Sequence, residues 1–159
     1  MQLEMNIPVA LPRDAYVVGT RSSGEAHGVV LTKAHVVDLI LNLADYTVAR
    51  DLTKLRLLDP ACGHGAFLVP AVERLLSAAE KFGVDGSELR HAIKAYDIDP
   101  EHVAVCREAI RKVLAQHKIT SGIAGELAES WAEVGDFLLE PQNATYDTVV
   151  GQVLIPFCL

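Results

Sequence analysis

The sequence predicts an α/β fold built on a parallel sheet. Short apolar runs that can form buried strands alternate with longer segments of helical periodicity, and a glycine turn joins the first such run to the helix after it. Right-handed crossovers would place these strands side by side in one sheet. The chain has 159 residues, of which 50% are hydrophobic and 22% charged, so it can form one core and no second domain.

The N-terminal segment, residues 1–30, has an irregular pattern. It contains Pro8 and Pro12 and then a polar cluster over residues 21–28, which is typical of a loop. Apolar residues at helical spacing follow Thr32 and predict a helix over residues 33–46. Thr32 is a suitable N-cap for this helix, because its hydroxyl can accept a hydrogen bond from a free backbone N–H.

The first strand is expected over residues 54–58, directly before Asp59 and Pro60. A glycine turn over residues 62–65 follows, and then a helix whose apolar residues share one stripe: Leu68, Val72, Leu75, Leu76 and Ala79. This order of strand, glycine turn and helix is the first unit of the predicted sheet.

The second strand is expected over residues 92–96. Asp99 and Pro100 then form a good N-cap and first-turn pair, and they predict a helix that runs to about His117. A helical segment over residues 123–131 leads into residues 134–138, and a last strand is expected over residues 145–150.

Charge is unevenly distributed along the chain. All 14 Lys and Arg residues lie at or before Lys118, whereas the last 41 residues carry six acidic residues and no basic one, within a net charge of −7. Such a segment repels a phosphate backbone. Composition alone therefore does not indicate a DNA-binding protein, and any nucleic-acid contact must come from another part.

The three cysteines, Cys62, Cys106 and Cys158, are too few and too far apart for a disulfide framework, and no Cys or His spacing indicates a metal site. A reducing compartment follows from this cysteine usage. The longest apolar stretch, residues 149–159, is interrupted by Gly151 and Gln152 and is too short to span a bilayer. We therefore expect a cytoplasmic protein with no membrane span and no metal.

Acidic residues follow three of the expected strands. Ligands of open α/β sheets bind beyond the carboxyl ends of the strands, which directs attention to residues 59–65, 97–99 and 136–137. Gly63 and Gly65 allow close approach of the backbone to a ligand, and the helix after them points free N–H groups into the same space. An acid at the second strand end can accept two hydrogen bonds from a ribose diol, and an acid–aromatic pair at the third can hold an adenine.

Each of these residues also has a structural interpretation, and the residues alone leave it open. Asp99 also fits the role of a helix cap without a ligand contact, and Phe137 also fits a position in the core. Cys62 and His64 fit turn positions better than a nucleophile and its base, because no third group that would activate them is evident. The ordered combination of strand ends is what favours a nucleotide-type ligand.

The run Asp59-Pro-Ala-Cys-Gly-His-Gly-Ala-Phe-Leu68 resembles the first cofactor motif, D-P-A-C-G-x-G-x-F-L, of the adenine-N6 DNA methyltransferases of restriction-modification systems. Residues 28–39 resemble the family's leading motif, G-x-x-x-T-P-x-x-V-V-D, and residues 96–100 and 135–138 resemble its second and third motifs. The resemblance covers residues 28 to 151. It implies a Rossmann-like fold that binds S-adenosyl-L-methionine.

For the methionine part of this cofactor, the resemblance assigns five residues. Thr32 would contact the methionine carboxylate, and the pocket for the amino-acid part would be shaped by Asp59, Ala61, Gly63 and Gly65.

For the nucleoside part, the resemblance assigns Asp97 to the ribose hydroxyls and Ile98 to a flank of the adenine. Asp136 would accept a hydrogen bond from the adenine amino group, and Phe137 would pack on the ring. Lys33 departs from the family pattern, which has proline at this position.

A larger departure follows the last strand. There the family has N-P-P-Y or N-P-P-F, whose asparagine side chain and first proline carbonyl accept hydrogen bonds from the target adenine while the aromatic ring stacks on the flipped base. This sequence reads Gln152-Val-Leu-Ile-Pro-Phe-Cys-Leu159 instead. No catalytic residue is assigned, and Gln152 is the nearest counterpart of the asparagine.

We therefore expect a truncated or frameshifted methyltransferase fragment with an incomplete C-terminal half. Its parts would be the irregular segment 1–30, a cofactor-binding subdomain over residues 31–151 and an apolar tail over residues 152–159 that does not match the family. DNA is the partner of the family enzymes, and for this chain alone we expect weak DNA binding or none, and no activity.

Two alternatives belong to other classes. One is a non-catalytic assembly module that pairs with a second polypeptide through the open edge of the sheet. The other is an NAD-dependent dehydrogenase, which the spacing disfavours: Asp97 lies 32 residues after Gly65, whereas the dinucleotide fingerprint places its acid roughly 20 residues further on. The turn also has Leu68 where that fingerprint has its third glycine.

Overall fold

The structure is a computed structural model that describes residues 33–139 and 144–151. The predicted irregular segment 1–30, Thr32, Gln152 and the tail over residues 152–159 lie outside the described residues. Among the described residues, no helix has the length and apolar character that a membrane span requires.

Four strands form one parallel sheet in the described residues, in the order β3-β2-β1-β4. They are β1 (Leu57–Asp59), β2 (Ile93–Asp97), β3 (Ala132–Val134) and β4 (Thr148–Val149). This arrangement confirms the predicted parallel α/β fold. Because β1 lies between β2 and β4, the chain crosses back over the sheet after β3, and β4 is an edge strand of the described sheet.

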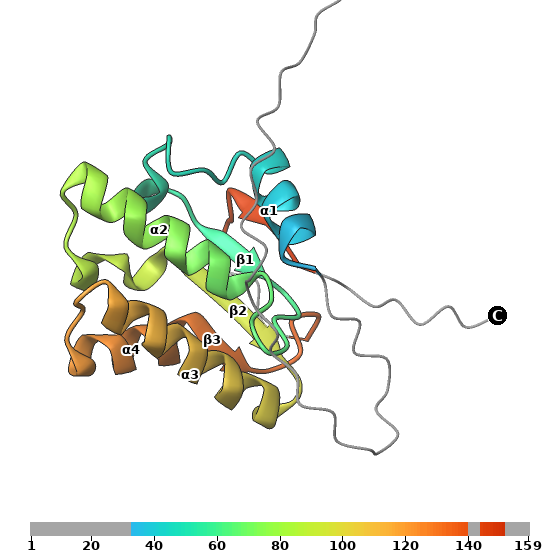
Figure 1. The fold of residues 1–159 in the computed structure, drawn as a ribbon. Helices are drawn as coiled ribbons and strands as arrows, with labels where there is room; N and C mark the ends of the chain where they lie inside the picture. Colours follow the sequence, from blue (N-terminus) through green and yellow to red (C-terminus); the bar gives the residue numbers. More distant parts are fainter. Residues whose placement is uncertain (1–32, 140–143, 152–159) are drawn as a thin grey trace, which may run out of the picture. The chain divides into compact units, whose positions relative to one another are not determined.

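The helices connect these strands. Helix α1 (Ala34–Leu43) precedes the sheet, α2 (Leu68–Phe82) links β1 to β2, and α3 (Pro100–Gln116) and α4 (Ser121–Trp131) link β2 to β3. Short 3₁₀ helices are η1 (Leu52–Lys54) and η2 (Gly86–His91). Figure 1 shows α2 and α3 in front of the strands. Asp99 caps α3 as predicted: its carboxylate accepts from the Glu101 N–H at 2.8 Å, and Pro100 occupies the first turn.

Several predicted boundaries were wrong. Helix α1 has Lys33, not Thr32, as its N-cap, and it ends at Leu43 because Asp45 adopts a positive φ of 54°. The first strand begins three residues late, since the N–H of Leu55 donates to the Leu52 carbonyl and closes a 3₁₀ turn there. The last strand has only two residues of the six predicted.

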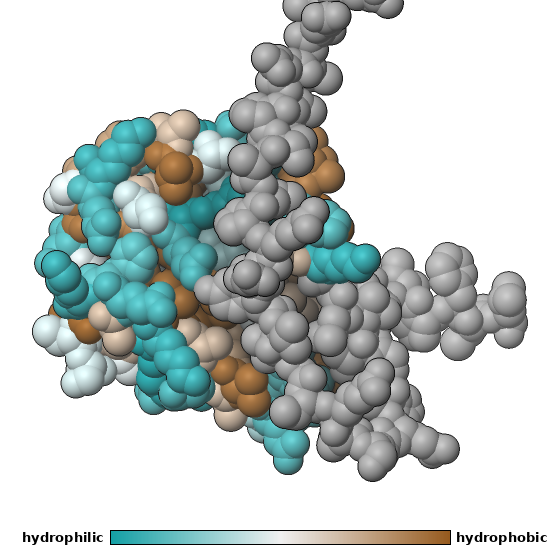
Figure 2. All heavy atoms as spheres, viewed as in Figure 1, coloured by the Kyte–Doolittle hydropathy of each residue, from teal (hydrophilic) through white to brown (hydrophobic). Residues whose placement is uncertain are grey.

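One core lies between the sheet and the helices. Alternate strand residues, Leu57, Ile93, Ala95 and Ala132, join it with the apolar stripes of all four α-helices. The stripe predicted for α2 is buried in this core. Trp131 is fully buried, and its indole N–H donates to the Leu89 carbonyl at 3.1 Å, so α4 and η2 are fixed together. On the outer side, Figure 2 shows hydrophilic residues predominating over the helices, with separate apolar residues between them.

Candidate functional site

The carboxyl ends of β1, β2 and β3 meet at one edge of the sheet, as parallel strands require. Asp59 is the last residue of β1 and Asp97 the last of β2, while Asp136 lies two residues beyond β3. A backbone hydrogen bond joins the end of β3 to the end of β2, because the N–H of Gly135 donates to the Asp97 carbonyl at 2.9 Å. The structure thus brings together three acidic residues that the sequence assigns to one site.

The glycine turn after β1 crosses to the end of β2. The N–H of Cys62 donates to the Tyr96 carbonyl at 2.8 Å, and the N–H of Gly63 donates to the Asp97 carboxylate at 2.8 Å. Gly63 has a φ of +52°, and a Cβ at this position would meet no atom within 4 Å. A side chain at this position would therefore point into open space, and the positive φ alone is what favours glycine here.

Gly65 is required for packing. Its φ is +92°, and a Cβ there would lie 3.0 Å from both the Cys106 Sγ and a Val69 methyl carbon. Any larger residue would push the turn away from α3 as well as strain the backbone. Close contact between the turn and the helices thus depends on this glycine.

Asp97 is the most connected side chain of the site. One carboxylate oxygen accepts from Gly63, and the other accepts from the Asp99 N–H at 2.9 Å. The His102 Nδ1 lies 3.3 Å from that second oxygen, and its Nε2 lies 3.7 Å from the Asp99 carboxylate. Each carboxylate oxygen has two lone pairs, so Asp97 keeps capacity to accept from a diol while it holds the turn.

The sequence motifs did not identify His102 as a residue of this site. It lies on the first turn of α3, and its ring stands edge-on to His64 with the centroids 4.5 Å apart. The sequence does carry a signal for His102. Asp99 caps a helix that begins at the end of β2, so the third residue of this helix lies close to that strand end. His64 is an exposed turn residue, as its structural interpretation predicts.

Asp59 is the buried acid of the site, with only 1% of its surface exposed. Burial raises the pKa of this carboxyl to about 7, and the nearby charge of Asp97 adds to the shift. In the described residues its carboxylate accepts one hydrogen bond, from the Ala61 N–H at 3.2 Å. A cationic group placed beside Asp59 would favour the ionised form of this carboxyl.

Gly151 approaches Asp59 from the end of β4. Its φ is +138°, and a Cβ there would lie 2.6 Å from the Asp59 Oδ1. No residue with a side chain fits this position without displacing the carboxyl group. The end of the fourth strand therefore adjoins the same site as the other three.

The residues assigned to the nucleoside part surround Asp97. Ile98 is 75% exposed and directly follows it, so its side chain is available to a ligand. Asp136 accepts from the Leu138 N–H at 3.0 Å in its own turn, which leaves its other oxygen available. The Phe137 ring lies 6.0 Å from the Tyr96 ring. These contacts are compatible with the assigned roles of Asp136 and Phe137, which remain predictions.

Cys62 is not a nucleophile in this structure. Its thiol is buried, and the neighbouring Cys106 thiol together with burial raises the pKa of Cys62 far above the usual range. A thiol in such surroundings stays protonated and unreactive. Within residues 33–139 and 144–151, no group of three or more His, Cys, Asp or Glu side chains could hold a metal ion.

Comparison with known proteins shows that this chain is similar in sequence to several methyltransferases. The chain is 37% identical over 137 residues to the Type II methyltransferase M.PaeR7I of Pseudomonas aeruginosa, over 84% of this chain and 24% of that protein. It is 33% identical over 145 residues to M.XhoI of Xanthomonas vasicola, over 85% of this chain and 27% of that protein. M.BstVI of Geobacillus stearothermophilus is 34% identical over 140 residues. Each is described as a Type II methyltransferase.

This chain is a relative of the Type II methyltransferases. It spans about a quarter of the length of the curated relatives it matches. No family model matches the chain. The match to Type II methyltransferases agrees with the resemblance inferred from the motifs, and it favours the methyltransferase interpretation over a dehydrogenase.

Substituting Gly65 tests the packing of the turn. Gly65→Ala should lower the free energy of unfolding by about 1–3 kcal/mol, because the new Cβ combines a positive φ with contact to Cys106 and Val69. Gly125→Ala in α4 is the control, since no atom lies within 4 Å of its Cβ position and alanine favours a helix. Urea unfolding followed by circular dichroism measures both. Equal effects of the two substitutions would contradict the packing role.

The pKa of Asp59 predicts a pH dependence of stability. The folded protein holds a proton on Asp59 up to about pH 7, whereas the unfolded chain loses it near pH 4, so this residue's contribution falls as the pH rises between these values. Relative to Asp59→Asn, the free energy of unfolding of the wild type should decrease by up to about 4 kcal/mol over this window. Urea unfolding at several pH values measures the difference.

Asp85→Asn is the control for this series. Hydrogen bonds from Ser87 lower the pKa of Asp85, so this carboxyl is ionised in both states above about pH 5 and should give a nearly constant difference there. A difference between wild type and Asp59→Asn that does not change with pH would show that Asp59 titrates normally.

Proposed function

We propose that this chain is the S-adenosyl-L-methionine-binding portion of an adenine-N6 DNA methyltransferase of a restriction-modification system, and that it does not transfer methyl groups alone. The observation that carries the proposal is the link between the glycine turn and the end of β2. The run Asp59-Pro-Ala-Cys-Gly-His-Gly65 forms a turn whose Gly63 N–H is bonded to the Asp97 carboxylate. Homology to Type II methyltransferases supports the same class.

The residues present fit this cofactor. Asp59 is a buried carboxyl with a raised pKa, which an ammonium group would stabilise in its ionised form. The backbone at Gly63 borders open space, and Ile98 offers an exposed apolar side chain beside the ribose-binding acid. In this proposal Asp59, Ala61, Gly63 and Gly65 hold the methionine part, with Thr32, which lies outside the described residues.

The nucleoside part would be held at the ends of β2 and β3. Asp97 would accept from the ribose hydroxyls, Ile98 would flank the adenine, Asp136 would accept from its amino group and Phe137 would cover the ring. When bound, S-adenosyl-L-methionine supplies an electrophilic methyl group on a positively charged sulfur. The described residues of this chain bind and orient that group, and position alone accounts for much of such a reaction's acceleration.

The acceptor side of the reaction is proposed to lie elsewhere. The family's N-P-P-Y or N-P-P-F motif, which would hold the target adenine, has no counterpart at residues 152–155. DNA is therefore the proposed substrate of the complete enzyme and not a strong ligand of this chain. Because that substrate is the cell's own DNA, the cytoplasm is the compartment we propose.

Calorimetric titration with S-adenosyl-L-methionine and S-adenosylhomocysteine tests cofactor binding. Asp97→Ala should weaken both by about 10- to 150-fold, which corresponds to a charge-assisted hydrogen bond of about 1.5–3 kcal/mol. Asp45→Asn, which removes the charge of an exposed carboxylate that pairs with Arg50 and keeps a residue type that tolerates its positive φ, should leave the affinities unchanged. No binding by the folded wild-type chain would refute the proposal.

Since Asp97 also holds the turn, a second variant separates binding from folding. Ile98→Ala removes an exposed side chain that the fold does not need, and it should weaken cofactor binding by about 3- to 10-fold through lost apolar contact with the adenine. Val105→Ala, at an exposed apolar position of α3, is the matched control and should have no effect.

The proposed reaction has its own test. The chain alone should incorporate no labelled methyl group into DNA from S-adenosyl-L-methionine. A chimera in which residues 28–151 replace the matched segment of M.PaeR7I should be active, and nucleoside analysis of its product should show N6-methyladenine. An inactive chimera that is folded would contradict the proposed role of this segment, and incorporation by the chain alone would contradict its proposed inactivity.

A further inference from the structure

His102 is a residue of the candidate site to which neither the motifs nor the proposed function gives a role. It is the third residue of α3, and its side chain is 30% exposed. Its Nδ1 lies 3.3 Å from the Asp97 Oδ1, and its Nε2 lies 3.7 Å from the Asp99 carboxylate. The imidazole ring therefore lies between the acid that ends β2 and the acid that caps α3.

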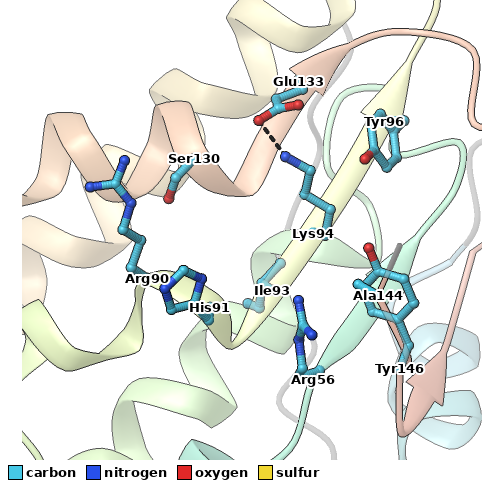
Figure 3. A pocket seen from close by; sticks show the side chains of 10 residues that line it. All are labelled: Arg56, Arg90, His91, Ile93, Lys94, Tyr96, Ser130, Glu133, Ala144 and Tyr146. Atoms are coloured by element: carbon cyan, nitrogen blue, oxygen red, sulfur yellow. Dashed lines mark ion pairs between the residues drawn. The ribbon is translucent and has the colours of Figure 1, made fainter. Parts of the chain in front are cut away.

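His102 is the ion-pair partner that these two acids share. Within the described residues, Asp97 and Asp99 pair with His102, and no Lys or Arg side chain pairs with either of them. Lys94, the cation on β2, lies three residues before Asp97, about 10 Å along the strand. Figure 3 shows that Lys94 lines a cavity of about 480 Å³ instead, where it is paired with Glu133. A ring nitrogen facing each carboxylate thus offsets the repulsion between the two acids.

The turn after β1 also contacts the imidazole. The His64 ring stands edge-on to the His102 ring, with the centroids 4.5 Å apart and the planes at 83°. Gly63, the residue before His64, donates its N–H to the Asp97 Oδ2 at 2.8 Å. The other oxygen, Oδ1, accepts from the Asp99 N–H at 2.9 Å and faces His102. Each oxygen of Asp97 is thus held by a different segment, and His102 lies against both segments.

The orientation of the Asp97 carboxylate matters for a diol. Two adjacent hydroxyls can both donate to one carboxylate only when its plane is turned toward them. The terminal torsion of an aspartate side chain is broad, so the side chain alone does not fix this plane. A ring nitrogen at 3.3 Å from Oδ1 restricts the rotation before a ligand arrives. An acceptor that is already oriented loses less conformational freedom on binding.

We infer that His102 is a positioning residue for Asp97, and that it holds the carboxylate plane in the orientation that accepts hydrogen bonds from both ribose hydroxyls of the cofactor. The inference rests on the proposed function, from which it takes the cofactor and the ribose-binding role of Asp97. His102 acts through Asp97 and not by touching the ligand. Its Nδ1 is a donor toward Asp97 in the imidazolium form and in one of the two neutral tautomers.

Calorimetric titration with two ligands separates positioning from general support of the fold. The ligands are S-adenosylhomocysteine and its 2′-deoxyribose analogue, which lacks one of the two hydroxyls. The wild type should bind the analogue about 10-fold or more weakly, since one hydrogen bond to a charged acceptor is lost. His102→Ala should weaken S-adenosylhomocysteine by about 3- to 10-fold and the analogue by less than about twofold. The ratio of the two affinities should therefore decrease.

Two further substitutions test the chemistry of the contact. His102→Asn keeps an N–H donor close to the place of Nδ1, and it should restore the affinity for S-adenosylhomocysteine to within about twofold of the wild type. His102→Leu fills much of the same space without a donor and should behave like His102→Ala. Failure of asparagine to restore the affinity would overturn the inference, because it would mean that the ring itself touches the ligand.

His117→Ala is the matched control. His117 also contacts a carboxylate, with its Nδ1 2.8 Å from the Glu80 Oε1, but it is the C-cap of α3, about 22 Å along the helix from His102. It should leave both affinities unchanged. Urea unfolding followed by circular dichroism shows that each variant is folded under the conditions of the titration.

The amide resonance of Gly63 provides a measurement without ligand. This N–H donates to Asp97, so a carboxylate that turns in His102→Leu should shift the Gly63 resonance. The resonance of Gly83, at the C-cap of α2, should not change. A Gly63 resonance that stays in place would show that His102 does not orient Asp97, and it would overturn the inference.

The outcomes separate this inference from the proposed function. A folded wild-type chain that binds neither ligand would refute the proposed function and this inference with it. A wild type that binds S-adenosylhomocysteine supports the proposed function, whatever the variants do. If His102→Ala then weakens both ligands equally, or neither, the inference alone is overturned. A decreased ratio together with recovery in His102→Asn would establish it.

Discussion

The carboxylate of Asp97 holds the candidate site together before any ligand is present. It accepts from Gly63 in the turn after β1 and from Asp99 at the start of α3, while the Asp97 carbonyl accepts from Gly135 after β3. Three loops from three strands are thus fixed around one residue. Since these hydrogen bonds are made in the folded chain itself, little ordering remains to be done on binding, which is the condition for tight recognition of a small ligand.

The two acids at the strand ends have different surroundings, and so they can have different roles. Asp97 accepts hydrogen bonds from Gly63 and Asp99, whereas Asp59 is buried and accepts one within the described residues, and burial raises the pKa of Asp59 to about 7. A carboxylate held by two backbone donors and a buried carboxyl that titrates near neutral pH therefore lie at neighbouring strand ends. This difference follows from burial and donors alone, because both residues are aspartates that end neighbouring parallel strands.

Periodicity and strand-end motifs predicted the sheet, the helices and the cap at Asp99, because these depend on local patterns that each segment carries. They could not predict the contact of Gly151 with Asp59, which depends on the spatial approach of distant segments, and they left out His102 although its place in the first turn of α3 is a local feature. The boundaries of α1, β1 and β4 were wrong for a related reason: a single positive φ or one 3₁₀ bond ends an element, and apolar periodicity does not record it.

The contact between Gly151 and Asp59 also limits how this domain can be joined to other sequences. The position two residues after β4 tolerates no side chain, because a Cβ would overlap the Asp59 carboxyl at 2.6 Å. Recombination between related genes, or a designed fusion, can exchange the segment beyond the fourth strand only if glycine is kept as the junction residue. The buried acid thereby restricts which sequences can follow the fourth strand.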